Sequence, residues 1–232
     1  MSTNLDFSVL LRDEYPQRIA EGLLTMFELT ALAWVLAMAV GVVLASIRMS
    51  DSCWAQAAVA AYVEYHQNVP MLVQIFLWYF GIPALLPSGL QQWLNANGSE
   101  FLFAFVAVGL CMGAYMSEGL RAGIRAIPIA QLEASRALGL SCMQATRLVM
   151  LPQALRIALP TLVSYTVLLF KNSSLAMTIG VAELTYATRE IESQSFRTVE
   201  VYLFATLVYL GISMLIMAGG AALEGRYRIK TR

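Results

Sequence analysis

The sequence predicts an all-α polytopic membrane protein with five transmembrane helices. The chain has 232 residues, of which 59% are hydrophobic and 13% are charged, about half the charged fraction of an average globular domain. Several long apolar runs could each cross the roughly 30 Å hydrocarbon core of a bilayer as a helix. The formal net charge is zero, so charge gives no sign of nucleic-acid binding.

The first 18 residues are polar and contain the charged side chains Asp6, Arg12, Asp13, Glu14 and Arg18. A secretory signal peptide would begin with a basic region and continue with a short apolar core, which this segment lacks. We therefore predict that residues 1–18 lie outside the membrane, and we expect the chain to be kept whole.

Five segments are predicted to span the membrane, namely 29–47, 55–80, 101–124, 157–182 and 201–223. In the first, Ala37, Gly41 and Ala45 recur every four residues, which lets a neighbouring helix pack closely. The second contains Pro70, which cannot donate a helical hydrogen bond, so a break is expected near Asn68. Residues 82–99, with prolines, glycines and polar amides, and the charged residues 183–200 are predicted to be outside loops.

The basic residues predict an orientation with the N-terminus outside and the C-terminus inside. Five spans in this orientation place ten of the fifteen Lys and Arg residues on the inner side, including those of the tail 226–232. The positive-inside rule favours this arrangement over its inverse. Residues 19–225 are then the transmembrane domain, and the connection 126–153 within it lies in the cytoplasm.

This connection is predicted to form two short helices joined by a glycine turn. Pro128 suits the first turn of a helix and Gly139 the position just past its end, which predicts a helix over 129–138. Ser141 and Gln144 have the spacing of a capping box and predict a second helix over 142–150, ending before Pro152. Such a hairpin is either ordinary interfacial structure or a protrusion that another protein grips.

No motif for catalysis or metal binding stands out. The sequence has no Gly-rich phosphate loop, His66 is its single histidine, and the three cysteines lack paired or metal-ligand spacing. We expect no catalytic residue, metal or cofactor in this chain, and any energy source to lie on a partner.

Lys171 is a charged residue deep in a predicted span. It must face a partner or a wet cavity, because exposure to lipid costs several kcal/mol. The alternative is a long stem that reaches the outer interface. Asn172, Ser173 and Ser174 follow it and could donate hydrogen bonds to a carboxylate, so all four are candidates for a substrate pathway.

Three more polar residues are candidates for the same pathway. Glu118 lies one helical turn before Arg121, so it is either half of an intrahelical ion pair or a cavity group that touches a substrate amine. Glu64 and Asn68 flank the interruption of the second span, with His66 between them. They form either a packed network around the kink, which is the favoured reading, or part of the pathway.

The cytoplasmic connection resembles the EAA loop of ABC importer permeases, in which Glu-Ala-Ala and a Gly precede a Leu-Pro pair. The sequence departs from that pattern at Ser135, where the family has a second Ala, and at Val149, where it has Ile. In that family the loop is the coupling helix, which sits in a cleft of the ATPase subunit. The resemblance assigns ATPase coupling to Glu133, Ala134, Ser135, Gly139, Leu151 and Pro152.

The resemblance covers residues 19–229 and is to permeases of polar amino-acid importers. It is carried by the segments 113–118, 151–160 and 171–180, while Tyr62–Glu64 and Asn68–Pro70 look closest to glutamate/aspartate importer permeases. It implies the type I ABC importer permease fold in a bacterial inner membrane, with residues 1–18 in the periplasm and the transport of glutamate or aspartate.

The same resemblance implies several partners. They are a second permease subunit, identical or different, an ATPase dimer that uses ATP and Mg, a periplasmic amino-acid-binding protein and membrane lipid. An importer of glutamine or a basic amino acid is the alternative. An ion-coupled carrier or channel would show inverted repeats, and five spans show no such doubling.

Overall fold

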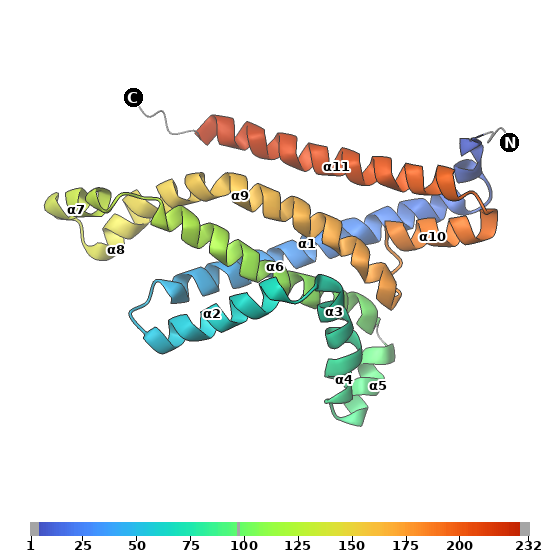
Figure 1. The fold of residues 1–232 in the computed structure, drawn as a ribbon, viewed down its shortest axis with the longest axis horizontal. Coiled ribbons are helices and arrows are strands. Elements are labelled where there is room, and N and C mark those ends of the chain that lie inside the picture. The colour runs from blue at the N-terminus through green and yellow to red at the C-terminus, as the bar shows by residue number, and fades with distance from the viewer. Residues whose placement is uncertain (1–4, 97, 228–232) are drawn as a thin grey trace.

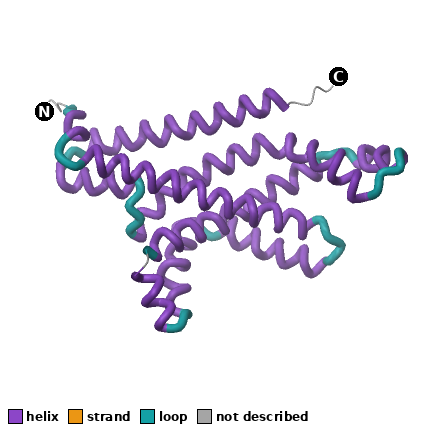
Figure 2. Tube along the Cα trace, turned by 180° about the vertical axis from the view of Figure 1, so that it is seen from behind, coloured by secondary structure: helices purple, strands orange, loops and turns teal. Residues whose placement is uncertain are grey.

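The computed structural model describes residues 5–96 and 98–227, and these residues are almost entirely helical (Figures 1 and 2). No strand occurs within these two ranges, which confirms the all-α class. The first element of the described residues is a short 3-10 helix, η1 (Phe7–Leu11). The last five residues of the predicted basic tail, 228–232, lie outside the described residues.

Four helices are long and apolar enough to cross a membrane, and they match four of the five predicted spans, although the helix that matches 157–182 ends at Ile179. They are α1 (Tyr15–Arg48), α6 (Ser99–Arg125), the helix that includes α9 (Leu151–Asn172), and α11 (Thr198–Tyr227). Helix α1 begins fourteen residues before the predicted span because Pro16, which has no N–H to satisfy, suits its first turn.

The second predicted span is divided, as expected. Helix α2 (Cys53–Asn68) ends at the predicted position, and α3 (Met71–Phe76) begins after Pro70. A π turn (Leu77–Gly81) and the single turn α4 (Ile82–Ala84) follow. Figure 1 shows α3 and α4 turning away from the direction of α2.

The connection after α4 is not the predicted loop, because it contains α5 (Ser88–Ala96). The Gln91 side chain closes the turn that precedes this helix. Its Nε2 donates to the carbonyl oxygens of Pro83 at 2.7 Å and Leu86 at 2.9 Å. These bonds satisfy carbonyls at the end of α4 and hold α4 and α5 side by side.

Helix α6 is the most buried of the four long helices and packs against α1, α2, α3 and α9. The predicted stripe of small residues on α1 faces it, since Ala37 and Ala45 are buried and a Cβ atom on Gly41 would lie 2.8 Å from the Cβ of Met116. The absence of a side chain at Gly41 therefore sets the distance between α1 and α6.

The helix after the Gly139 turn does not end before Pro152, contrary to the prediction. Helix α8 (Cys142–Ala145), a π turn (Thr146–Met150) and α9 form one continuous helix. The proline ring needs room beside the carbonyl group four residues earlier, at Leu148. The wider π turn places Pro152 at the second position of the regular segment that follows, where its missing N–H is tolerated.

The connection 183–200 is also more ordered than predicted. Helix α9 continues into a 3-10 helix (Ser173–Ile179), which Gly180 ends with a φ of +92°. Helix α10 (Leu184–Ser195) then covers most of the predicted loop. Its start is fixed by Glu183, whose side chain accepts hydrogen bonds from the backbone N–H groups of Thr185 and Tyr186.

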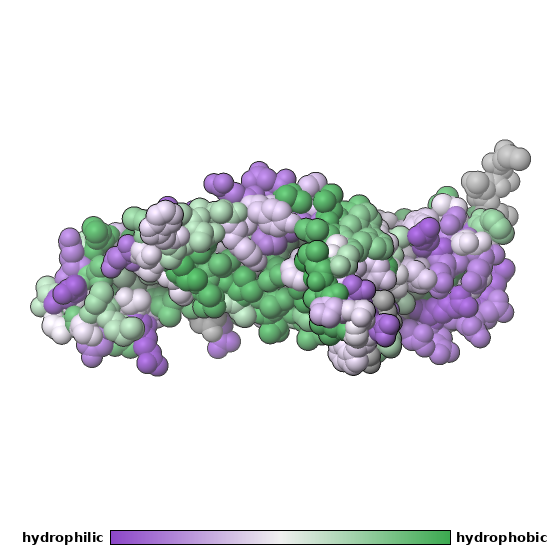
Figure 3. All heavy atoms as spheres, turned by 90° about the horizontal axis from the view of Figure 1, so that it is seen from below, coloured by the Kyte–Doolittle hydropathy of each residue, from purple (hydrophilic) through white to green (hydrophobic). Residues whose placement is uncertain are grey.

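The long helices place two different regions at opposite ends of the molecule. Figure 1 shows α7 (Ile129–Ala137), α8 and the end of α11 at one end, and η1 with α10 at the other. Figure 3 shows an apolar middle, with polar residues gathered mainly toward the end that carries α10. This distribution is expected of a body that spans a membrane.

Candidate functional site

The turn after α7 has the geometry that its sequence predicts. Gly139 has a φ of +85°, its N–H donates to the carbonyl oxygen of Arg136 at 2.9 Å, and the N–H of Leu140 donates to that of Ser135 at 3.2 Å. This pair of bonds is a Schellman motif, which requires a left-handed residue at the glycine position. The predicted helix 129–138 is confirmed to within one residue.

The capping box of the second helix is also confirmed. The N–H of Gln144 donates to the Oγ of Ser141 at 3.3 Å, and the N–H of Ser141 donates to the Oε1 of Gln144 at 2.9 Å. Both turns of the hairpin are thus fixed by local hydrogen bonds. Residues 126–153 therefore form a defined protrusion, and we call residues 129–145 the coupling hairpin.

The coupling hairpin exposes large apolar side chains that this chain leaves uncovered. Ile129 is 72% exposed, Leu138 84% and Met143 75%. Glu133 and Ala134 are exposed as well, and the Glu133 carboxylate has no hydrogen bond or ion pair within residues 5–96 and 98–227. Large exposed apolar side chains with an available charge nearby are typical of a protein-protein contact.

Ser135 takes a different position from its neighbours in the predicted coupling set. It is only 4% exposed, and its Oγ donates back to the carbonyl oxygen of Leu132 at 3.1 Å. A serine that bonds to its own helix in this way needs no outside partner. Ser135 therefore packs the hairpin, and the exposed face is formed by residues on either side of it.

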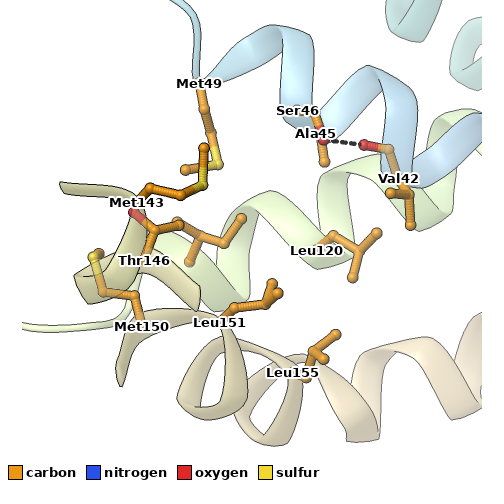
Figure 4. A pocket seen from close by; sticks show the side chains of 11 residues that line it. Val42, Ala45, Ser46, Met49, Leu120, Met143, Thr146, Met150, Leu151 and Leu155 are labelled. Atoms are coloured by element: carbon orange, nitrogen blue, oxygen red, sulfur yellow. Dashed lines mark hydrogen bonds between the residues drawn. The ribbon is translucent and has the colours of Figure 1, made fainter. Parts of the chain in front are cut away.

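An apolar pocket of about 460 Å³ lies between the coupling hairpin and the body of the molecule (Figure 4). One wall comes from α8, the π turn and the start of α9, where Leu151 points into it. The other wall comes from the ends of α1 and α6. Its lining is Val42, Ala45, Ser46, Met49, Leu120, Ile124, Met143, Thr146, Met150, Leu151 and Leu155. The hairpin is thus not packed tightly onto the ends of α1 and α6.

Glu118 forms an ion pair within its own helix. The Nε of Arg121 donates to both of its carboxylate oxygens, at 3.0 and 2.9 Å, and the guanidinium of Arg48 on α1 lies 3.5 Å from the Oε1. Of the two readings that the sequence left open, this geometry favours the intrahelical pair. The Glu118 carboxylate thereby links α1 to α6, and both of its oxygens already have partners in this structure.

Lys171 lies near the opposite end of α9, on an open cavity of about 400 Å³ between α9, α10 and α11. It is the only charged residue of the lining, and its Nζ makes no hydrogen bond or ion pair in the described part of the chain. The rest of the lining comes from Ser174, Thr185, Tyr202, Ala205, Thr206 and Tyr209. The hydroxyl groups of Ser174 and Thr206 donate to backbone carbonyl oxygens, and those of Thr185 and Tyr209 donate to Glu183. The Lys171 ammonium is therefore the group of the lining that suits a carboxylate ligand.

The residues that follow Lys171 do not share one environment. Ser174 lines the cavity, whereas Ser173 is fully buried and its Oγ donates to the carbonyl oxygen of Phe170 at 2.7 Å. Thr30 of α1 donates to the same Oγ at 3.3 Å. Asn172 is half-buried. Of the three predicted neighbours, the structure brings Ser174 to the cavity beside Lys171.

Glu183 is a functional candidate that the sequence analysis missed. It is completely buried behind the cavity, and the hydroxyl groups of Thr185 and Tyr209 donate to its Oε2 at 3.2 and 2.9 Å. Burial raises the pKa of this carboxyl group above its usual range, although the hydrogen bonds oppose the shift. Glu183 thereby fixes two of the hydroxyl groups that line the cavity.

The break in the second span is held by a side chain that the sequence analysis did not single out, Gln74. Its Oε1 lies 2.6 Å from the Nδ1 of His66, and its Nε2 donates to the carbonyl oxygens of His66 and Val69. Glu64 and Asn68 are exposed, and the Nδ2 of Asn68 donates to the backbone carbonyl oxygen of Glu64 at 2.7 Å. A buried network does hold the break, but it joins His66 to Gln74 and leaves Glu64 and Asn68 outside it.

The fold and these sites together define a class of protein. Apolar helices cross the membrane, a structured hairpin protrudes at one end with an uncovered apolar face, and a polar cavity opens near the other end. This is the architecture of a membrane transport permease.

Comparison with known proteins gives the particular family. Residues 37–229 match the family described as "Binding-protein-dependent transport system inner membrane component", and the chain belongs to it. A probable amino-acid ABC transporter permease protein, PatM, of Vibrio harveyi is 35% identical over 83% of each chain. The glutamate/aspartate import permease protein GltJ of Escherichia coli strain K12 is 33% identical over 91% of this chain and 87% of its own.

A solved structure supports the same assignment. One chain of a crystal structure described as an amino acid ABC transporter with histidines matches with a TM-score of 0.82 and 29% identity, covering 97% of this chain and all of that one. Relatives named for glutamine, arginine and octopine transport also match. The protein is an amino-acid ABC importer permease of the type I fold, a transport subunit embedded in the membrane.

Proposed function

We propose that this permease imports an acidic amino acid, glutamate or aspartate, and that Lys171 contacts the substrate in the cavity between α9, α10 and α11. The observation that carries the proposal is the lining of that cavity, where a single cation without a partner stands among hydroxyl groups and no carboxylate is exposed. Every amino acid brings one carboxylate, and an acidic one brings two. A site whose one charged residue is a cation therefore favours a substrate with an acidic side chain over one with a basic side chain.

The likeness to a relative named as a glutamate/aspartate permease supports this choice of substrate. Asn172, Ser174 and the buried Glu183–Tyr209 pair would complete the site, Glu183 by holding the hydroxyl groups in place. Glu118, Glu64, Asn68 and Ser173 remain predicted pathway residues, but in this conformation they are either engaged in hydrogen bonds or distant from the cavity lining.

We further propose that the coupling hairpin docks onto an ATPase on the cytoplasmic side. Ile129, Leu138 and Met143 would enter its cleft, with Glu133 at the rim. ATP and Mg would be bound by that ATPase, a periplasmic amino-acid-binding protein would deliver the substrate at the α10 end, and a second permease subunit would complete the pathway. This requires the N-terminus outside and the C-terminus inside a bacterial inner membrane, as the positive-inside rule predicts.

The test is uptake of labelled glutamate into vesicles that hold the chain with its second permease subunit, its ATPase and the binding protein, with ATP supplied at the ATPase side. We expect uptake to require ATP and to be inhibited best by unlabelled aspartate. Lys171→Gln should raise the KM for glutamate about ten-fold or more, because a hydrogen bond to a charged group is lost. Lys171→Arg should keep most of the affinity.

The control is Arg189→Gln, which removes another cation of the α10 end that lies outside the cavity lining. If glutamine or arginine inhibits uptake better than aspartate, the acidic substrate is wrong. If Lys171→Gln and Arg189→Gln have the same effect on KM, Lys171 does not contact the substrate.

A further inference from the structure

A groove separates α9 from α11 at the end of the molecule that carries the coupling hairpin. The two helices touch where Gly220 faces Val163, since a Cβ atom on Gly220 would lie 2.5 Å from a methyl group of Val163. On the hairpin side of this contact, Leu223 of α11 lies beside the first turns of α9. The two helices leave a space of about 300 Å³ that is lined by Pro152, Leu155, Arg156, Leu159 and Leu223.

The lining combines four apolar side chains with one cation. Arg156 is exposed, and its guanidinium makes no hydrogen bond or ion pair within the described residues. Arg226, three residues after Leu223 on α11, adds a second exposed cation, and Glu224 is the acidic residue beside it. The mouth of the groove therefore keeps an excess of positive charge, while its walls are apolar.

We propose that this groove binds an anionic phospholipid of the cytoplasmic leaflet, with one acyl chain against Leu155, Leu159 and Leu223 and the headgroup phosphate on Arg156. At this depth an apolar groove between two spanning helices is filled by lipid tails, and basic pockets between such helices on the cytoplasmic side recognise anionic headgroups. The volume lies at the lower end of the range for ligand pockets.

The position of the groove gives the lipid a structural role. Pro152 and Leu155 belong to the first turns of α9, directly after the π turn that follows the coupling hairpin. Leu155 also lines the pocket on the other side of α9, between that helix and the ends of α1 and α6. A bound lipid supports the segment of α9 that has an open space on both sides.

The placement in the cytoplasmic leaflet rests on the orientation proposed above, but the test does not depend on transport. The full chain, with the subunits that purify with it, is titrated in detergent with phosphatidylglycerol and phosphatidylcholine of identical acyl chains, and bound lipid is counted by native mass spectrometry. We expect tighter binding of phosphatidylglycerol. Arg156→Gln should weaken its binding about five-fold and leave phosphatidylcholine unchanged.

Two further variants keep the test specific. Arg136→Gln removes an exposed cation of α7 outside the groove and should change neither lipid, whereas Leu223→Trp should fill the groove and weaken both. Equal affinity of the unmodified protein for the two lipids overturns the proposal. An equal loss of phosphatidylglycerol binding in Arg136→Gln and Arg156→Gln also overturns it, and so does unchanged binding of both lipids in Leu223→Trp. None of these outcomes would affect the uptake assay, so the two proposals fail separately.

Discussion

Replacing Gln74 with leucine should destabilise the protein strongly, because the Gln74 side chain donates hydrogen bonds to backbone carbonyl groups at the break in the second span. The carbonyl oxygen of His66 needs an outside donor, since Pro70, four residues later, has no N–H. Gln74 is 1% exposed and supplies that donor at 3.1 Å, together with a bond of 2.8 Å to the carbonyl of Val69. Each buried group left without a partner costs about 1–3 kcal/mol, so a total loss of about 2–5 kcal/mol is expected.

The measurement is unfolding by sodium dodecyl sulfate in mixed micelles, followed by circular dichroism. Gln67→Leu is the matched control, because Gln67 is exposed on the same helix, and it should change the free energy of unfolding by less than about 0.5 kcal/mol. The thiol of Cys111, 3.5 Å from the His66 carbonyl, can replace only part of the lost bond. If both variants unfold at the same detergent fraction, the hydrogen bonds of Gln74 do not hold the break.

Two other predictions concern glycines. Gly139→Pro should reduce ATP-driven uptake ten-fold or more without changing the unfolding of the spans, since proline cannot adopt a φ of +85°. Gly139→Asn should retain uptake, because asparagine tolerates a left-handed conformation. Normal uptake in the proline variant would argue against coupling through the hairpin. Gly123→Ala should lower the free energy of unfolding by about 1–3 kcal/mol in the same assay, because its Cβ would lie 2.5 Å from the carbonyl oxygen of Ala154. Gly119→Ala should change this free energy little, because the nearest contact of its Cβ would be at 3.3 Å. Equal stability of the two alanine variants would contradict the close approach of α6 and α9.

The features predicted best from the sequence are those fixed by neighbours along the chain. The Schellman turn at Gly139 and the capping box of Ser141 and Gln144 depend on residues within five positions of one another, and both form as expected. The long spans follow from apolar length alone. Pro70 also acts locally, because its missing N–H ends α2 whatever surrounds it.

The features that were missed depend on contacts from elsewhere. Charge content made residues 183–200 look like a loop, although the residues of α10 that are buried, Leu184, Ala187, Thr188 and Ile191, have the spacing of one helical face. That signal was available and was outweighed by the charges. The π turn was not predictable from Pro152 alone, since proline is compatible both with a helix end and with a wider turn.

The two candidate sites are joined by one piece of secondary structure. The continuous helix from Cys142 to Asn172 begins in the coupling hairpin and ends beside Lys171, a length of roughly 45 Å. A displacement of the hairpin moves this helix, which has two points where it can bend, the π turn and Pro160, whose missing N–H leaves one helical hydrogen bond unmade. The π turn and the open spaces beside Leu155 lie near the hairpin end, so adjustment is concentrated there. The end beside Lys171 is held firmly by the buried Ser173 and the 3-10 helix that follows. A push at the hairpin would therefore reach the cavity as a movement of the part of α9 that follows Pro160 against α10 and α11.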